Sequence, residues 1–172
     1  GLHSDQYVQC AQLFSYPKHA EIICTALSEK IKNNFSKIDI ILSPALGGIV
    51  VGYEMGKQLK TRTIFAERDS DKLSLRRGFT IPRGANVLVV EDVITTGKSA
   101  LECSKIVEIN KANLTGFACI IDRSDNNVLI KEKIISQIKI KIDIYKVNEL
   151  PDKLKKIPAT KPGSRNISND KN

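Results

Sequence analysis

The chain has 172 residues, of which 41% are hydrophobic and 27% are charged, and this composition is typical of one globular domain with its own core. No segment approaches the roughly 18 consecutive apolar residues of a membrane-spanning helix, and no secretory signal opens the chain, so we expect a cytoplasmic protein without a membrane partner. The net charge of +8 suits an anionic small molecule, whereas 5% aromatic residues without tryptophan argue against a stacking platform for single-stranded nucleic acid.

The N-terminal part predicts a strand followed by a helix. Residues 7–13 alternate loosely between apolar and polar, which favours a half-buried strand. Pro17 then indicates a helix start, and the apolar spacing of Ala20, Leu27 and Ile31 predicts a helix as far as about Asn33. Because the chain opens at Gly1 and not at a methionine, we expect that an N-terminal segment is missing.

Strands and helices then alternate. The predicted strands cover residues 38–42, 63–66, 87–90 and 114–121, and the predicted helices residues 49–60 and 98–110. This order predicts an α/β fold, in which a central, mostly parallel sheet is flanked by helices and ligands gather at the carboxyl ends of the strands. Residues 67–83 are hydrophilic and predict a mobile loop or ribbon, and residues 160–172 a tail at the end of a single domain over 1–172.

The most informative run covers residues 87–99. An apolar strand opens onto Glu91 and Asp92, whose carboxylates can accept hydrogen bonds from a vicinal diol. Residues 95–99, Thr-Thr-Gly-Lys-Ser, follow at the start of a helix, where backbone N–H groups and hydroxyls can surround a phosphate. The run therefore predicts a site for a sugar phosphate.

Two other interpretations of this run are weaker. Residues 97–99 match the end of the triphosphate-binding pattern G-x-x-x-x-G-K-[ST], but the first glycine of that pattern falls on Asp92, whose carboxylate would repel phosphate. A buried strand with an acidic end and an ordinary helix cap would leave the consecutive acids and the Thr-Thr-Gly turn unexplained.

Two more turns follow predicted strands. Residues 44–48, Pro-Ala-Leu-Gly-Gly, form a glycine turn whose exposed N–H groups could hold a diphosphate, although such a turn alone could serve only tight packing. Asp122 and Arg123 follow the last predicted strand, and the guanidinium could hold a carboxylate by two hydrogen bonds, although an Asp-Arg pair is more often a surface ion pair. Cys10, Cys24, Cys103 and Cys119 lie far apart, so we expect buried thiols and no protein-bound metal.

Residues 87–99 resemble the phosphoribosyl pyrophosphate (PRPP) motif of the type I phosphoribosyltransferases, and residues 44–48 lie where that family has its pyrophosphate loop. The pair Asp122-Arg123, with residues 4–9, 65–68, 75–79 and 161–165, resembles the short form of the orotate phosphoribosyltransferase family. The resemblance implies the type I phosphoribosyltransferase fold with a flexible loop over the active site. It also implies transfer of ribose 5-phosphate from PRPP to orotate, which gives orotidine 5′-monophosphate and diphosphate in pyrimidine synthesis.

The resemblance implies a role for each turn. The diphosphate contacts would be Ala45, Leu46, Gly47 and Gly48, the ribose 5-phosphate contacts Glu91, Asp92, Val93, Ile94, Thr95, Thr96, Gly97, Lys98 and Ser99, and the orotate contact Arg123. Loop residues Arg68, Lys72, Arg76 and Arg77 would close over the diphosphate, and the catalytic set would be Glu91, Asp92, Lys72 and Arg68. Mg²⁺ would be held mainly through PRPP, and a homodimer would share loop residues across its interface.

The chain departs from the long bacterial form of this family in two positions. Gly47 stands where that form carries a lysine, and Asp69 where it carries a second basic loop residue, so the resemblance leaves open which loop cation is catalytic. A family lysine near the N-terminus would belong to the missing segment. A purine phosphoribosyltransferase and a PRPP-sensing regulator that binds nucleic acid remain as alternatives; the second would use the net charge of +8.

Overall fold

The computed structural model describes residues 2–124 and 128–160. The chain divides into two compact units, one of residues 10–141 and one that joins residues 1–9 to residues 142–172. In the smaller unit, β1 (Leu2–His3) pairs antiparallel with β8 (Tyr145–Lys146), followed by the 3-10 turn η1 (Val147–Glu149) and α5 (Asp152–Lys155). Lys153 Nζ lies 2.8 Å from Asp5 Oδ2 within this unit. The predicted tail and the stretch 161–165 lie outside the described residues.

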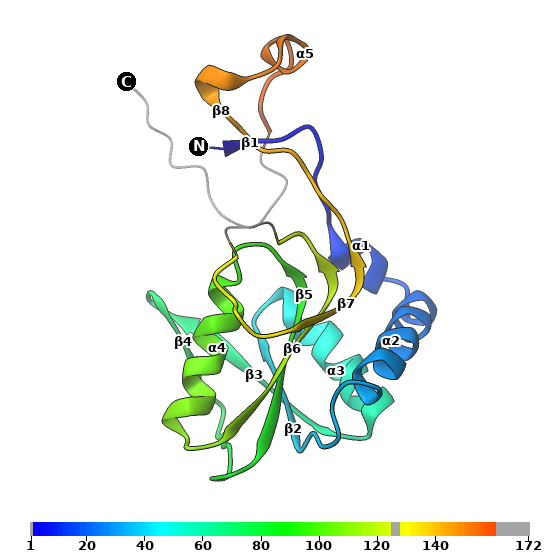
Figure 1. The fold of residues 1–172 in the computed structure, drawn as a ribbon, viewed down its shortest axis with the longest axis vertical. Coiled ribbons are helices and arrows are strands. Elements are labelled where there is room, and N and C mark those ends of the chain that lie inside the picture. The colour runs from blue at the N-terminus through cyan, green and yellow to red at the C-terminus, as the bar shows by residue number, and fades with distance from the viewer. Residues whose placement is uncertain (1, 125–127, 161–172) are drawn as a thin grey trace. The chain divides into compact units, whose positions relative to one another are not determined.

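The larger unit is built on a six-stranded sheet in the order β4-β3-β2-β5-β6-β7 (Figure 1). All neighbouring strands run parallel except β4, which pairs antiparallel with β3 at one edge. This confirms the predicted α/β fold with a mostly parallel sheet. The strands are β2 (Ile40–Pro44), β3 (Arg62–Asp69), β4 (Lys72–Leu75), β5 (Asn86–Ile94), β6 (Asn113–Asp122) and β7 (Ile134–Lys139).

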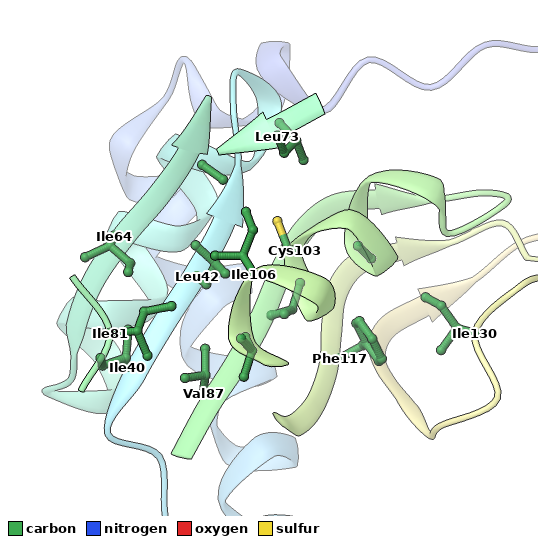
Figure 2. Close-up of a cluster of buried hydrophobic side chains, with 14 of the residues drawn as sticks. Ile40, Leu42, Ile64, Leu73, Ile81, Val87, Cys103, Ile106, Phe117 and Ile130 are labelled. Carbon is green, nitrogen blue, oxygen red and sulfur yellow. The ribbon is translucent and has the colours of Figure 1, made fainter. Parts of the chain in front are cut away.

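Helices cover both faces of this sheet. α4 (Lys98–Ile109) packs on β2, β4, β5 and β6, whereas α3 (Gly47–Leu59) packs on β2, β3 and β5 and α2 (Pro17–Lys32) on β6 and β7 (Figure 1). Alternate residues of a strand point to opposite faces. Leu42 and Val87 therefore pack against Cys103 and Ile106 of α4, as Figure 2 shows, while Leu88 faces the other layer. All four cysteines are buried free thiols, as predicted.

The predicted strand over residues 7–13 is wrong, because the structure has a short helix there, α1 (Cys10–Phe14). Cys10 and Phe14 are buried and the two residues after Cys10 are exposed, which is the burial pattern of a helix and not of a strand. Loose apolar alternation over seven residues fits both periods, so it could not distinguish them.

Several boundaries also differ from prediction. β5 continues four residues beyond Val90 to Ile94, because its pairing with β6 runs through the acidic residues. The hydrophilic segment 67–83 contains the end of β3 and all of β4, so of the two predicted forms, loop or ribbon, it begins as a paired β-ribbon. β7 was not predicted, since only its first two residues form an apolar run and most of the rest are polar.

Three glycines bring α3 close to the sheet. Gly48, Gly52 and Gly56 recur every fourth residue, and a Cβ at any of them would meet atoms of β2 or β3, in particular Ser43 beside Gly52 and Thr63 beside Gly56. The backbone of α3 therefore lies directly against side chains of β2 and β3. Because α3 begins at Gly47, this packing also fixes the turn that leads into it.

Candidate functional site

The acidic pair, Glu91 and Asp92, lies near the C-terminal end of β5. Glu91 is in register with Cys119 of β6, and the strand ends three residues later at Ile94. Consecutive strand residues point to opposite faces, so Glu91 shares the α4 face with Val89 and Asp92 points to the α3 face. The two carboxylates therefore stand on the same strand end but on opposite sides of the sheet.

Burial dominates the electrostatics of this pair. It raises the pKa of Glu91 to about 8, and the neighbouring Asp92 raises it further in the same direction. The pKa of Asp92 is also raised by burial, but hydrogen bonds from the backbone N–H groups of Val93 and Asp92 oppose that effect. Burial thus favours the protonated form of Glu91, and a ligand that brings hydrogen-bond donors or positive charge would favour the carboxylate form of both residues.

Asp92 meets the glycine turn after β2. A Cβ on Gly47 would lie 2.8 Å from Asp92 Oδ2, so only glycine fits against this carboxylate without a shift. Ala45 N–H donates to Ala66 O at 2.8 Å, which ties the turn to β3, and the Ala45–Leu46 peptide bond is cis. Leu46 and Gly47 are exposed and Gly48 is buried. The structure thus brings the predicted diphosphate turn and the predicted ribose site together.

The predicted phosphate loop lies between β5 and α4. Gly97 has a φ of 79° and precedes the first residue of α4, and Thr95, Thr96 and Lys98 are exposed around it. A helix N-terminus with free N–H groups favours an anion. Ser99 is partly exposed, whereas Ile94 is 1% exposed and its side chain packs in the core, so Ile94 offers a ligand only its backbone.

A segment after β6 supports this loop. Leu129 N–H donates to Thr96 O at 3.1 Å, and a Cβ on Gly97 would lie 2.7 Å from Ile130 Cγ1. Arg123 N–H donates to Ile94 O at 2.8 Å. The connection between β6 and β7 therefore holds the end of β5 at two points. The sequence does not indicate this support, because nothing in the short apolar run of residues 128–130 connects it to Gly97.

Arg123 directly follows β6 at the same edge of the sheet. Its Nε is buried and finds no hydrogen-bond partner among residues 2–124 and 128–160. A buried guanidinium nitrogen without an acceptor costs free energy, about 1–3 kcal/mol for a polar group. The side chain is thus suited to an acceptor that a ligand would supply.

The basic residues of the ribbon differ in their partners. Arg68 Nη2 lies 3.1 Å from Glu102 Oε2 of α4, and Arg77 makes a two-point pair with Glu67, with both N···O distances at 2.8 Å. Arg76 is 4.0 Å from Asp69, while Lys72 has no ion pair among the described residues. Sequence reasoning missed Glu67 and Glu102, whose role depends on contacts between distant segments.

The described part of the chain holds no cluster of three or more His, Cys, Asp or Glu side chains placed for a metal ion. Glu91 and Asp92 are the acidic side chains at the site. Within residues 2–124 and 128–160, no helix has both the length and the apolar character that crossing a bilayer requires.

The phosphoribosyl transferase domain model matches residues 12–153. The chain is 44% identical, over 96% of its length and 86% of the relative, to an orotate phosphoribosyltransferase of Thermoanaerobacter sp. (strain X514). Its fold is similar to that of orotate phosphoribosyltransferase from Aeropyrum pernix, with a TM-score of 0.67, 16% identity and 78% of each chain covered. Adenine phosphoribosyltransferase from Thermoanaerobacter pseudethanolicus gives a TM-score of 0.67 at 18% identity, covering 78% of this chain and 88% of that one.

Proposed function

The chain belongs to the phosphoribosyl transferase family and, within it, to the orotate phosphoribosyltransferases, and from this premise we propose how its residues carry out the reaction. The enzyme transfers the 5-phosphoribosyl group from PRPP to orotate, which gives orotidine 5′-monophosphate and diphosphate in pyrimidine synthesis. The observation that carries the assignment of the site is the contact between Gly47 and Asp92, because it joins a diphosphate turn to a carboxylate at one strand end.

The ribose 5-phosphate lies between β5 and α4. N–H groups and hydroxyls of residues 95–99 hold the 5′-phosphate at the start of α4. Asp92 accepts hydrogen bonds from the ribose hydroxyls on the α3 side, and Glu91 supports the sugar from the α4 side. Cleavage of the anomeric bond builds positive charge on the ribose, and the acidic pair stabilises it without itself transferring a proton.

The diphosphate lies over residues 45–48, whose backbone faces Asp92. The acidic residues fit Mg²⁺, since this ion is commonly held by one or two carboxylates together with substrate phosphates and not by an all-protein cage. Asp92, which faces the glycine turn, would hold it together with PRPP, and the ion would supply positive charge beside the departing diphosphate. Asp92 orients the sugar, and the turn at Gly47 orients the leaving group.

Lys72 is the loop cation that approaches the diphosphate. Arg68 and Arg77 are engaged with Glu102 and Glu67, whereas Lys72 sits at the start of β4 without an ion pair among the described residues. A free ammonium on a long side chain can reach a ligand without breaking an existing pair. Closure of the ribbon over the site would exclude water from PRPP.

Arg123 binds the orotate carboxylate. Its backbone is fixed to Ile94 O, and its buried Nε has no acceptor among the described residues. A guanidinium matches a planar carboxylate by two parallel hydrogen bonds. Orotate carries such a carboxylate, and a purine base does not. This residue therefore accounts for the choice of base.

The partner of the enzyme is a second copy, which docks on α3. Leu46, Val50 and Tyr53 follow helical spacing and are 80%, 49% and 71% exposed, so they form one apolar surface on the outer side of α3. Lys57 at its end is paired with Glu21 and Glu54, and exposed Lys60 follows at the end of α3. Two copies can meet here through the three apolar side chains, and the contact begins at the diphosphate turn.

The reaction is tested by following orotate absorbance with PRPP and Mg²⁺ for the full-length protein. Asp92→Asn and Arg123→Ala should each lower kcat/KM by about 100-fold or more, because each removes a charged contact to substrate. Arg62→Ala is the matched control, since Arg62 is an exposed arginine that bonds Thr80 O away from the site. Consumption of PRPP with adenine, hypoxanthine or uracil but not with orotate would overturn the assignment.

The dimer is tested by light scattering after size-exclusion chromatography. Tyr53→Glu should give a monomer, whereas Ile109→Glu, at an equally exposed apolar residue of α4, should not. Mixing the weakly active variants Lys72→Ala and Asp92→Asn should raise the activity to about one quarter of the wild-type value if the ribbon closes over the partner's site, because half the dimers then hold one intact site. No recovery would limit the ribbon to its own subunit.

A further inference from the structure

Asp122 is a buried carboxylate to which the sequence assigned no role of its own. It is the last residue of β6 and is 5% exposed. Its Oδ1 accepts the backbone N–H of Ser124 at 2.8 Å, its Oδ2 lies 3.4 Å from Lys139 Nζ, and its backbone O accepts the N–H of Ile140 at 2.9 Å. All three contacts lie at the C-terminal end of β6, next to Arg123.

The contact with Ser124 encloses Arg123. A hydrogen bond that a side-chain oxygen accepts from the N–H two residues on closes a turn around the residue between them. Arg123 N–H in turn donates to Ile94 O on the neighbouring strand. The backbone of Arg123 is thus held on both sides, which directs its side chain and leaves its Nε buried without an acceptor among the described residues.

We propose that Asp122 is a positioning residue for the base site, which acts through Arg123 to set the affinity and selectivity for the carboxylate of orotate. The inference rests on the proposed role of Arg123. A long arginine side chain has several rotatable bonds, and holding its backbone reduces the freedom that it loses when a carboxylate binds. Buried Asp122 therefore affects the binding of orotate and not the binding of PRPP.

The contacts separate two roles of the carboxylate, its position and its charge. Asp122→Asn keeps an oxygen acceptor for Ser124 N–H but loses the charge that faces Lys139. Asp122→Glu keeps the charge but moves the carboxylate by one methylene. Lys139→Met removes the ion pair alone, from an exposed lysine. If the turn around Arg123 is what matters, then Asp122→Asn and Lys139→Met are mild and Asp122→Glu is not.

The test measures KM for orotate and KM for PRPP separately. Asp122→Ala and Asp122→Glu should raise KM for orotate about tenfold and leave KM for PRPP within about twofold, as expected for a hydrogen bond lost at one subsite. Asp122→Asn and Lys139→Met should stay within about threefold of the wild type in both constants. Where Asp122→Ala fails to fold, the contrast between Asp122→Asn and Asp122→Glu still decides the question. Equal rises in both KM values would overturn the proposal.

A double-mutant cycle with Arg123→Ala shows whether Asp122 acts through Arg123. In the Arg123→Ala background, Asp122→Glu should have no further effect on KM for orotate, because the group it positions is gone. If the effects of Asp122→Glu and Arg123→Ala on KM for orotate multiply, Asp122 does not act through Arg123. The inference then fails, while the proposed role of Arg123 stands. If Arg123→Ala itself leaves KM for orotate unchanged, the proposed base site fails, and the inference with it.

Discussion

The carboxylate of Asp92 lies against the backbone of Gly47, such that a Cβ at residue 47 would be 2.8 Å from Oδ2 and 2.9 Å from Oδ1. The two residues come from different strand ends, β5 and β2, which are neighbours in the sheet. In the proposed site, this contact is where the sugar and the diphosphate of PRPP would meet.

Gly47→Ala should lower kcat/KM for PRPP by about 10- to 100-fold, because the added methyl group must displace Asp92 from the sugar. The fold should be retained, since Gly47 is exposed. Steady-state kinetics with varied PRPP measures the effect. Gly84→Ala is a control, because a Cβ at Gly84 meets nothing within 4 Å and should affect stability only, through its positive φ. Unchanged kinetics in Gly47→Ala would show that Asp92 moves freely.

Glu91→Gln should change the pH dependence of stability. The folded pKa of Glu91 is raised from 4.5 to about 8, so between these values the unfolded chain releases this proton and the folded chain keeps it. The free energy of unfolding of the wild type therefore falls as pH rises through this window, relative to the variant, by up to about 1.4 kcal/mol per pH unit. Urea unfolding at pH 5, 6, 7 and 8 compares the two. Parallel curves would contradict a protonated Glu91.

Gly97→Ala should reduce both stability and PRPP binding. Its φ of 79° strains any side chain, and its Cβ would meet Ile130 Cγ1 at 2.7 Å. We expect a loss of about 1–3 kcal/mol in the free energy of unfolding. Urea unfolding and KM for PRPP measure the two effects. Combining it with Ile130→Ala should relieve the clash but not the backbone strain, so PRPP binding should stay weaker than in Ile130→Ala alone.

Lys72→Ala and Arg77→Ala should separate catalysis from local structure. Lys72→Ala should lower kcat by about 10-fold or more with little loss of stability, because it removes charge near the diphosphate and no internal pair. Arg77 is paired with Glu67 and lies 5.9 Å from the Phe65 ring centre, so its loss should mainly loosen the ribbon. Single-turnover rates and thermal unfolding distinguish these outcomes. A larger kcat effect for Arg77→Ala would reverse the assignment of the loop cation.

The sequence predicted those parts of the fold in which local pattern and tertiary structure agree. The start of α4 at Lys98 followed from the Gly97 turn, and the buried strands from their apolar runs. β5 was predicted to end at Val90, because Glu91 and Asp92 are polar, yet Glu91, Val93 and Ile94 continue the ladder with β6. A local pattern cannot reveal pairing that a distant strand provides.

The same limit applies to the site. The sequence singled out both glycine turns and Arg123 as candidates, because glycines and charged residues at strand ends are local signals, and their binding roles stay predictions. It did not show that Glu91 and Asp92 leave opposite faces of the sheet, since that depends on the strand continuing through them. It also could not show which ribbon cations are already paired, because Glu102 contacts Arg68 across a long sequence separation.

The two hydrogen bonds from the segment after β6 to the end of β5 have a geometric consequence. Arg123 N–H donates to Ile94 O and Leu129 N–H donates to Thr96 O, so the proposed base contact and the predicted phosphate loop are both anchored to the end of β5. We therefore expect the spacing between the two proposed subsites to be fixed by main-chain hydrogen bonds and not by side-chain conformation.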